Sequence, residues 1–92
     1  MAYHLDFTDK ANEDIACHRN TGNKAILNKL RVLLEELTEH PFSGIGKPEP
    51  LKHNLSGMWS RRINREHRLV YEVEKDIVFI LSAKGHYKKS KS

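Results

Sequence analysis

The 92-residue sequence contains little cysteine, little proline and no long hydrophobic run. Its one cysteine, Cys17, has no second cysteine with which to form an internal disulfide, so a disulfide-stapled secreted scaffold is excluded. No apolar stretch approaches the ~20 residues that a membrane-spanning helix needs. The first six residues also lack the basic start and apolar stretch of a signal peptide. We therefore expect a cytoplasmic protein that does not contact a membrane.

Signals for metal binding and for internal repeats are missing as well. The histidines lie at positions 4, 18, 40, 53, 67 and 86, and no pair of them has the spacing of metal ligands on a helix. We expect neither a metal nor another cofactor. The length suits a single domain, which we place at residues 1–87, followed by a basic flexible tail at residues 88–92.

Charge is plentiful and is unevenly distributed along the chain. Charged residues make up 30% of the sequence, and the formal net charge is +4. Residues 1–50 carry six basic and eight acidic side chains (net −2), whereas residues 51–92 carry ten basic and four acidic ones (net +6). This asymmetry favours a polyanionic partner that binds the C-terminal half.

The hydrophobic pattern of the first half predicts one strand and two helices. Residues 3–7 alternate between apolar and polar, which is typical of a short half-buried strand. Thr8 or Asp9 can cap a helix that runs to about Arg19. A continuous leucine-rich stripe predicts a second helix, which Pro41 ends, and its members are Ile26, Leu27, Leu30, Leu33, Leu34 and Leu37.

The second half begins with a long connection and continues with three strands. Residues 41–58 are rich in proline and glycine, and we expect a loop without secondary structure that serves the function. Strands are predicted at residues 59–63, 67–73 and 77–84, and the turns between them are short enough to force antiparallel hairpins. The fold class is therefore α+β. An N-terminal strand and two helices precede a three-stranded antiparallel meander, which completes a four-stranded sheet.

Three-residue turns in both hairpins would set the strand registers. Arg62 would then lie opposite Arg68, and Tyr71 would lie opposite Phe79. The face that packs on the helices would contain Trp59, Ile63, Leu69, Tyr71, Val73, Ile77, Phe79 and Leu81. The opposite face would carry Val70, Val78 and Ile80 at one end and a basic patch at the other, made of Ser60, Arg62, Arg68, Ser82 and Lys84. Two directly opposed arginines repel each other, so an anion such as phosphate is expected between them.

Three segments resemble a known family. They are GKPEPLKHNLSGMWSRRI at residues 46–63, EHRLVY at residues 66–71 and GHY at residues 85–87. Together they closely resemble the YoeB/Txe toxins of the RelE superfamily, and the resemblance covers the whole chain in element order. It implies a RelE-like fold with a strand, two helices and an antiparallel sheet.

The same resemblance implies an activity and a set of partners. It implies the toxin of a type II toxin–antitoxin module, which acts as a ribosome-dependent, metal-independent endoribonuclease and cuts the mRNA codon in the ribosomal A site. The implied partners are the 70S ribosome, the A-site mRNA and a cognate antitoxin with an acidic C-terminal segment. A homodimer is also implied.

Site residues follow from the resemblance position by position. Glu49 matches the general base, Arg68 the arginine that stabilises the phosphate, and His86 the general acid. Tyr87 matches a terminal aromatic that orients the substrate, and the remaining matches are basic pocket residues, Lys52 and Arg62. RNA carries its own nucleophile, the 2′-hydroxyl, so a base, an acid and a charged phosphate ligand are sufficient for cleavage.

The residues alone leave other functions open. One is a non-catalytic RNA- or ribosome-binding module that inhibits translation by occupancy, with Arg68 and Arg62 holding phosphates and Glu49 inert. Another is a protein-interaction domain whose basic groove receives an acidic peptide. Arg68 can also be read as the partner in a structural ion pair. Substitution of Glu49 and of His86 separates these readings from catalysis.

Overall fold

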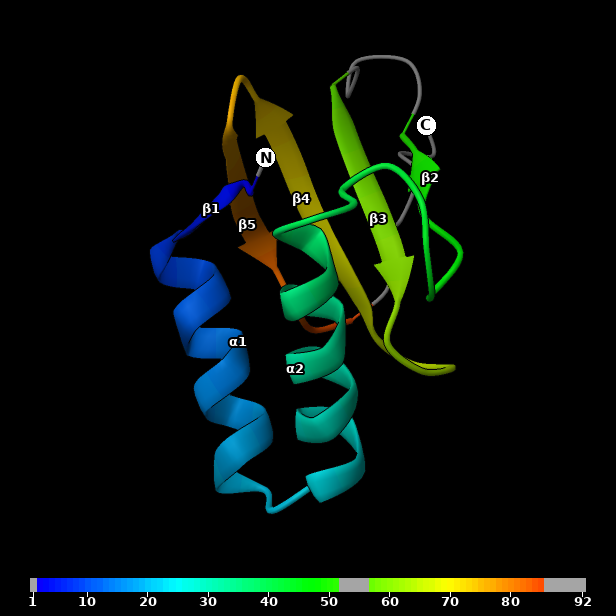
Figure 1. Ribbon diagram of the computed structural model, residues 1–92. Helices are drawn as coiled ribbons and strands as arrows, with labels where there is room; N and C mark the ends of the chain where they lie inside the picture. The colour runs from blue at the N-terminus through cyan, green and yellow to red at the C-terminus, as the bar shows by residue number, and fades with distance from the viewer. Residues whose placement is uncertain (1, 52–56, 86–92) are drawn as a thin grey trace, which may run out of the picture.

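A computed structural model describes residues 2–51 and 57–85. Two helices lie side by side over one face of a mixed five-stranded sheet, and the other face is not covered by either helix (Figure 1). The elements in chain order are β1 (His4–Phe7), α1 (Asp9–Asn20), α2 (Lys24–Leu37), β2 (Glu49–Pro50), β3 (Met58–Arg62), β4 (Arg68–Glu74) and β5 (Ile77–Ser82). No helix in this part of the chain is long and apolar enough to cross a membrane.

The sheet differs from the predicted one in strand number and in strand direction. Its order is β1-β5-β4-β3-β2, so it has five strands rather than four. β1 runs parallel to β5, which makes the sheet mixed rather than antiparallel. A parallel pair needs a long crossover, and here α1, α2 and the three following strands all lie between β1 and β5. The fifth strand, β2, falls in the connection that we expected to lack secondary structure.

Local sequence signals explain where the two helices begin. Thr8 caps α1, since its Oγ1 accepts a hydrogen bond from the backbone N–H of Ala11 at 3.1 Å. Asn23 caps α2 in the same way, accepting from the N–H of Ile26 at 3.1 Å. α2 ends at Leu37, four residues before Pro41. The predicted leucine stripe is confirmed as the core-facing side of α2, and its buried members are Ile26, Leu30, Leu33 and Leu37.

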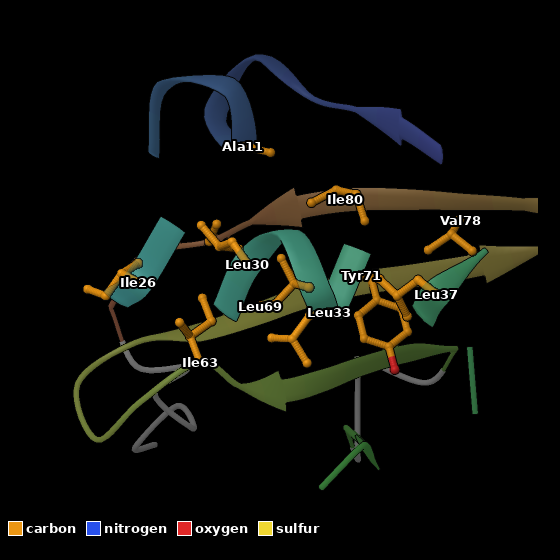
Figure 2. Close-up of a cluster of buried hydrophobic side chains, with 11 residues drawn as sticks. Ala11, Ile26, Leu30, Leu33, Leu37, Ile63, Leu69, Tyr71, Val78 and Ile80 are labelled. Carbon is orange, nitrogen blue, oxygen red and sulfur yellow. The ribbon is translucent and has the colours of Figure 1, made fainter. Parts of the chain in front are cut away.

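The core lies between the helices and the sheet. Figure 2 shows Leu33 and Leu37 of α2 in one cluster with Leu69 and Tyr71 of β4. The buried apolar residues are Ala11, Ile26, Leu30, Leu33, Leu37, Ile63, Leu69, Tyr71, Val78, Ile80 and Ala83. Each of the buried valine, leucine and isoleucine side chains is worth about 1.5–3 kcal/mol of transfer free energy. The core therefore holds β3, β4 and β5 in fixed positions relative to the helices.

The first predicted hairpin is confirmed and the second is wrong by one residue. Arg62 lies opposite Arg68, as a three-residue turn requires. In the second hairpin Glu74 pairs with Ile77, so the turn has only two residues, and Lys75 adopts a positive φ of 57°. The predicted core residues Ile77, Phe79 and Leu81 are consequently only half-buried, and Val78 and Ile80 fill the core instead.

An irregularity in the pairing of β4 with β5 shifts the register by one residue and returns Ser82 to the face on which it was predicted. Tyr71 pairs with Ile80 but Val70 pairs with Ser82, so Leu81 is an extra residue, as in a β-bulge. Thr8 Oγ1 donates to the carbonyl oxygens that flank this point, those of Ile80 and Leu81, each at 3.1 Å. Ser82 thereby lies on the predicted face but opposite Val70 rather than Arg68. β5 also ends there, two residues before the predicted end at Lys84.

Candidate functional site

Two of the predicted site residues meet on the sheet face that the helices leave uncovered. Arg68 Nη2 lies 3.3 Å from Glu49 Oε1, although the two residues are 19 positions apart in the sequence. Arg68 Nε also donates to Ser60 Oγ at 3.1 Å. The Arg68 side chain is 18% exposed and that of Glu49 is 60% exposed. The structure thus joins the predicted base and the predicted phosphate ligand in one solvent-accessible pair.

The registers of β2, β3 and β4 explain this meeting. Glu49 pairs with Ser60, and Ser60 pairs with Val70, two residues after Arg68. Residues that lie opposite each other, or two apart on one strand, share a face, so the side chains of Glu49, Ser60 and Arg68 project to the same side. Ser60 was expected on this face, but its hydrogen bond to the guanidinium was not predicted.

β2 is held at the sheet edge by a close backbone contact just before it. The Gly46 carbonyl accepts from the Arg62 N–H at 2.7 Å. Gly46 has a φ of +81°, and a Cβ placed there would lie 3.0–3.2 Å from Leu33, Arg61 and the Arg62 carbonyl oxygen. Only glycine suits both constraints. Pro50 is tolerated in β2 because β2 is the last strand of the sheet, where a missing N–H costs nothing.

Of the other predicted basic residues, Arg62 lies beside the Glu49–Arg68 pair, whereas Lys84 lies beyond the end of its strand. Arg62 is exposed, and it lies directly opposite Arg68. Within residues 2–51 and 57–85, Arg62 has no ion-pair partner. Lys84 is exposed and lies after the end of β5. The remaining predicted site residues, Lys52, His86 and Tyr87, lie outside the described residues, as does the predicted tail at residues 88–92.

The chain end that leads to His86 is tied to the start of β4. The Arg68 N–H donates to the Gly85 carbonyl at 3.0 Å, and the Gly85 N–H donates to His67 Nδ1 at 2.9 Å. Gly85, with a φ of +83°, therefore lies against the backbone of the predicted phosphate ligand. No site role was predicted for His67 from the sequence. Its position next to Arg68 is the only sequence signal for a site role.

The chemistry available here is proton transfer and anion binding. A carboxylate can accept a proton, and a guanidinium presents several N–H donors in the planar geometry that suits a phosphate. Over residues 2–51 and 57–85, no group of three or more His, Cys, Asp or Glu side chains is arranged to hold a metal ion.

A cavity of about 330 Å³ lies elsewhere, on the helix side of the sheet, and its walls are mainly apolar, with Leu5, Ile15, Leu30 and Leu34 among them. It is not part of this site.

Comparisons with known proteins agree with one another. A family model described as "YoeB-like toxin of bacterial type II toxin-antitoxin system" matches residues 7–87. Toxin RelK of Mycobacterium tuberculosis is 60% identical over 87 residues, which is 90% of this chain and 96% of that protein.

Two solved structures from Staphylococcus aureus have the same fold. The YoeB dimer superposes with a TM-score of 0.83 at 41% identity, covering 95% of this chain and 100% of that one. A YoeB–YefM complex gives a TM-score of 0.80 at 42% identity, with the same coverage of both chains.

Proposed function

Since the chain belongs to the family of YoeB-like toxins of bacterial type II toxin–antitoxin systems, we propose that it is a metal-independent endoribonuclease that cleaves mRNA in the A site of the ribosome. The family predicted from the sequence segments is confirmed, and the chain is a toxin of such a module. The single observation that supports the proposed chemistry is the contact of 3.3 Å between Glu49 and Arg68 on the uncovered face of the sheet.

In this proposal Glu49 is the general base. Its exposed carboxylate removes the proton of a ribose 2′-hydroxyl while the 2′-oxygen attacks the adjacent phosphorus. Arg68 neutralises the charge that develops on the phosphoryl oxygens, and Arg62, which lies opposite it in the sheet, adds positive charge. Lys52, assigned by the resemblance, and Lys84, predicted from the strand pattern, are proposed to contribute further positive charge to phosphate binding.

The reaction also needs an acid for the leaving group. His86 is proposed to protonate the departing 5′-oxygen, and Tyr87 to orient the substrate, which leaves a 2′,3′-cyclic phosphate or its hydrolysed 3′-phosphate. One general acid or base contributes about 10²–10⁴-fold to such a rate. Alignment of the mRNA by the ribosome supplies a further part of the acceleration, because positioning alone can remove several kcal/mol from a barrier.

The Glu49–Arg68 ion pair has a role in this scheme before RNA binds. It holds the guanidinium on the open face, and the incoming phosphate competes with Glu49 for Arg68. When the phosphate takes over the guanidinium, the carboxylate is released to act as a base. The Glu49 carboxylate is 60% exposed, so water can solvate it once the phosphate has replaced it as the partner of Arg68.

Partners and compartment are part of the same proposal. The Staphylococcus aureus YoeB structures form a dimer and a complex with YefM, and we propose that this chain likewise forms a homodimer and binds a cognate antitoxin. The net charge of +6 over residues 51–92 suits the acidic C-terminal segment expected of that antitoxin. Action on mRNA and the 70S ribosome implies the cytoplasm.

The test measures mRNA cleavage on purified ribosomes with a defined A-site codon and maps the new 3′ ends. Glu49→Gln and Arg68→Lys are expected to lower the single-turnover cleavage rate by about 10²–10⁴-fold. Glu35→Gln is the matched control, because Glu35 is also an exposed carboxylate that pairs with an arginine, at 3.5 Å from Arg31. It is expected to leave the rate unchanged.

Two results contradict the proposal. Undiminished cleavage by Glu49→Gln removes the base from the mechanism. Inhibition of translation by the wild type without any new mRNA end establishes the alternative, in which the toxin inhibits by occupying the ribosome.

A further inference from the structure

Two of the three residues that follow β5, Ala83 and Gly85, are held at their backbone from two separate parts of the chain. From α1, Asp14 Oδ2 accepts from the Ala83 N–H at 3.0 Å, and His18 Nε2 lies 2.8 Å from the Ala83 carbonyl oxygen. At the start of β4, His67 Nδ1 accepts from the Gly85 N–H, and the Arg68 N–H donates to the Gly85 carbonyl. We call this set of four hydrogen bonds the 83–85 clamp.

The clamp is built from polar side chains that the fold has buried. Asp14 is 6% exposed and His18 is 4% exposed, while Ala83 is completely buried. Burial of polar groups is unfavourable unless they are hydrogen-bonded, and these side chains direct their bonds to one short piece of backbone. Lys10 Nζ, 3.0 Å from Asp14, neutralises the carboxylate.

The partners determine whether one nitrogen of each imidazole ring donates or accepts. A backbone N–H only donates, so His67 must accept at Nδ1. A carbonyl only accepts, so His18 must donate from Nε2. The two rings meet edge to face, with centroids 4.7 Å apart, and each ring therefore limits the tilt of the other. The remaining nitrogen of His67, Nε2, lies 3.8 Å from Glu66 Oε1.

We propose that His67 is a positioning residue of the RNA-cleaving site, and that it acts by holding the Gly85 amide through Nδ1 while His18 supports its ring. The inference rests on the proposed function, in which His86, the residue after Gly85, is the general acid. Gly85 is bonded to the backbone of Arg68, so the clamp fixes the point at which the chain leaves the sheet relative to the phosphate ligand.

The location of the hydrogen bond between Gly85 and His67 distinguishes a positioning role from a contribution to the stability of the fold. β5 has already ended at Ser82, so the clamp extends no strand ladder, and Gly85 is not part of the apolar core. The hydrogen bond from Gly85 to His67 instead connects two backbone segments that each lead directly to a proposed site residue, Arg68 in one and His86 in the other. A loss of this bond is therefore expected to affect the reaction more than the folding equilibrium.

The experiment compares two substitutions of His67 in the full-length toxin. His67→Asn places an amide oxygen close to the position of Nδ1 and keeps an acceptor for Gly85. His67→Phe keeps an aromatic ring against His18 but removes the acceptor. His4→Phe, at an exposed histidine of β1, is the matched control. Amide hydrogen exchange at Gly85 is followed by NMR, and single-turnover mRNA cleavage and ribosome affinity are measured in parallel.

We expect His67→Phe to speed exchange at Gly85 by about five- to tenfold, as loss of one hydrogen bond would. We expect its cleavage rate at saturating ribosome to fall by about 10- to 100-fold, with ribosome affinity unchanged, because the defect lies in alignment and not in binding. His67→Asn is expected to keep both the slow exchange and most of the cleavage rate.

Each other result has a distinct meaning. If His67→Phe exposes Gly85 to exchange but cleaves at the wild-type rate, the positioning role is wrong while the proposed function stands. Equal losses of cleavage in His67→Asn and His67→Phe, with Gly85 protected in His67→Asn, also overturn it. If His67→Phe does not fold, His67→Asn is compared with the wild type alone. A large loss of cleavage in His67→Asn while Gly85 stays protected then overturns the positioning role. A wild type that protects Gly85 but never cleaves mRNA refutes the proposed function itself.

Discussion

Arg61 Nη1 donates to Glu36 Oε1 at 2.6 Å, and the Arg61 side chain is completely buried. The guanidinium also donates to the Tyr71 hydroxyl and to loop carbonyl oxygens, those of His40, Ser43 and Ile45. A single buried cation therefore ties α2, β4 and the loop after α2 together. That loop leads to Gly46 and then to Glu49, so Arg61 supports the candidate site from the opposite face of the sheet.

Replacement of Arg61 by methionine is expected to lower the free energy of unfolding by about 3–5 kcal/mol. Methionine fills most of the space, but it leaves the Glu36 carboxylate and the loop carbonyls without their donor, and breaking a buried pair from one side carries a cost of that size. Because Glu36 is 25% exposed, we expect the lower end of this range. Urea unfolding followed by circular dichroism measures the change.

Arg62→Met is the control for that experiment. Arg62 is the next residue along β3 and is exposed, so its replacement is expected to change the stability by less than about 0.5 kcal/mol. Equal losses for Arg61→Met and Arg62→Met would show that the buried network adds nothing to the folded state.

Tyr71 is expected to make stability depend on alkaline pH. Burial raises the pKa of its phenol above 10.0, and this outweighs the hydrogen bond and positive charge of Arg61, which lower the pKa. The folded state thus holds the neutral phenol, which donates to the Pro41 carbonyl at 2.7 Å. The stabilisation is complete below the unfolded-state pKa and is lost as the pH rises through the higher folded-state pKa.

The Tyr71→Phe variant tests whether the stabilisation by Tyr71 is lost as the pH rises. At pH 8 it is expected to be less stable than the wild type by about 1–3 kcal/mol, because the Pro41 carbonyl and Arg61 Nε lose a partner. The difference in urea midpoint between the two proteins should then shrink as the pH rises above 10.0. Lysine deprotonation occurs in both proteins and cancels. A difference that stays constant with pH contradicts the assignment.

The two hairpins show which parts of the sheet a sequence can predict. The first turn contains Asn64, whose Oδ1 accepts from the N–H groups of Glu66 and His67, each at 2.8 Å. Asparagine favours such turns, and the three-residue turn assumed for this hairpin gave the correct register of β3 and β4. The second turn uses Lys75 in a left-handed conformation, which lysine seldom adopts, and nothing in its sequence signals a two-residue turn.

The candidate site was predictable only in part for related reasons. The pairing of Arg62 with Arg68 followed from the assumed three-residue turn. Glu49 instead reached the site through β2, and its two flanking prolines argue against a strand. Only the family resemblance placed Glu49 there. Burial of Arg61 was missed because a charged side chain is rarely buried unless it is paired, and its partners come from a loop whose path the sequence does not reveal.

Gly46→Ala is expected to displace β2 and so to separate Glu49 from Arg68. A Cβ at this position would approach the Arg62 carbonyl oxygen to 3.1 Å and Leu33 Cδ2 to 3.0 Å, in addition to the strain of a φ of +81°. We expect a loss of about 1–3 kcal/mol in stability and a marked fall in cleavage rate.

Gly22→Ala separates the clash at Gly46 from backbone strain. Gly22 has a similar φ of +71°, but no atom lies within 4 Å of the added Cβ, so the substitution introduces strain alone. Its stability cost is expected to be near 1 kcal/mol, and cleavage should be unaffected. If Gly22→Ala impairs cleavage as much as Gly46→Ala, the effect comes from general destabilisation and not from the position of β2.

Arg62 is expected to bind a phosphate of the RNA directly, and the salt dependence of binding detects this. Arg62→Gln and Arg31→Gln remove the same charge from exposed side chains, but Arg31 lies on α2 and pairs with Glu35. Binding of a short single-stranded RNA with 2′-O-methyl groups, which blocks cleavage, is measured by fluorescence anisotropy at several salt concentrations. Because each phosphate contact contributes about 0.7 to the slope of log K against log salt, Arg62→Gln should reduce the slope by about that amount, and Arg31→Gln should leave it unchanged. Equal reductions in both variants would mean that the RNA senses only the net charge of the protein, and that the uncovered face of the sheet is not where it binds.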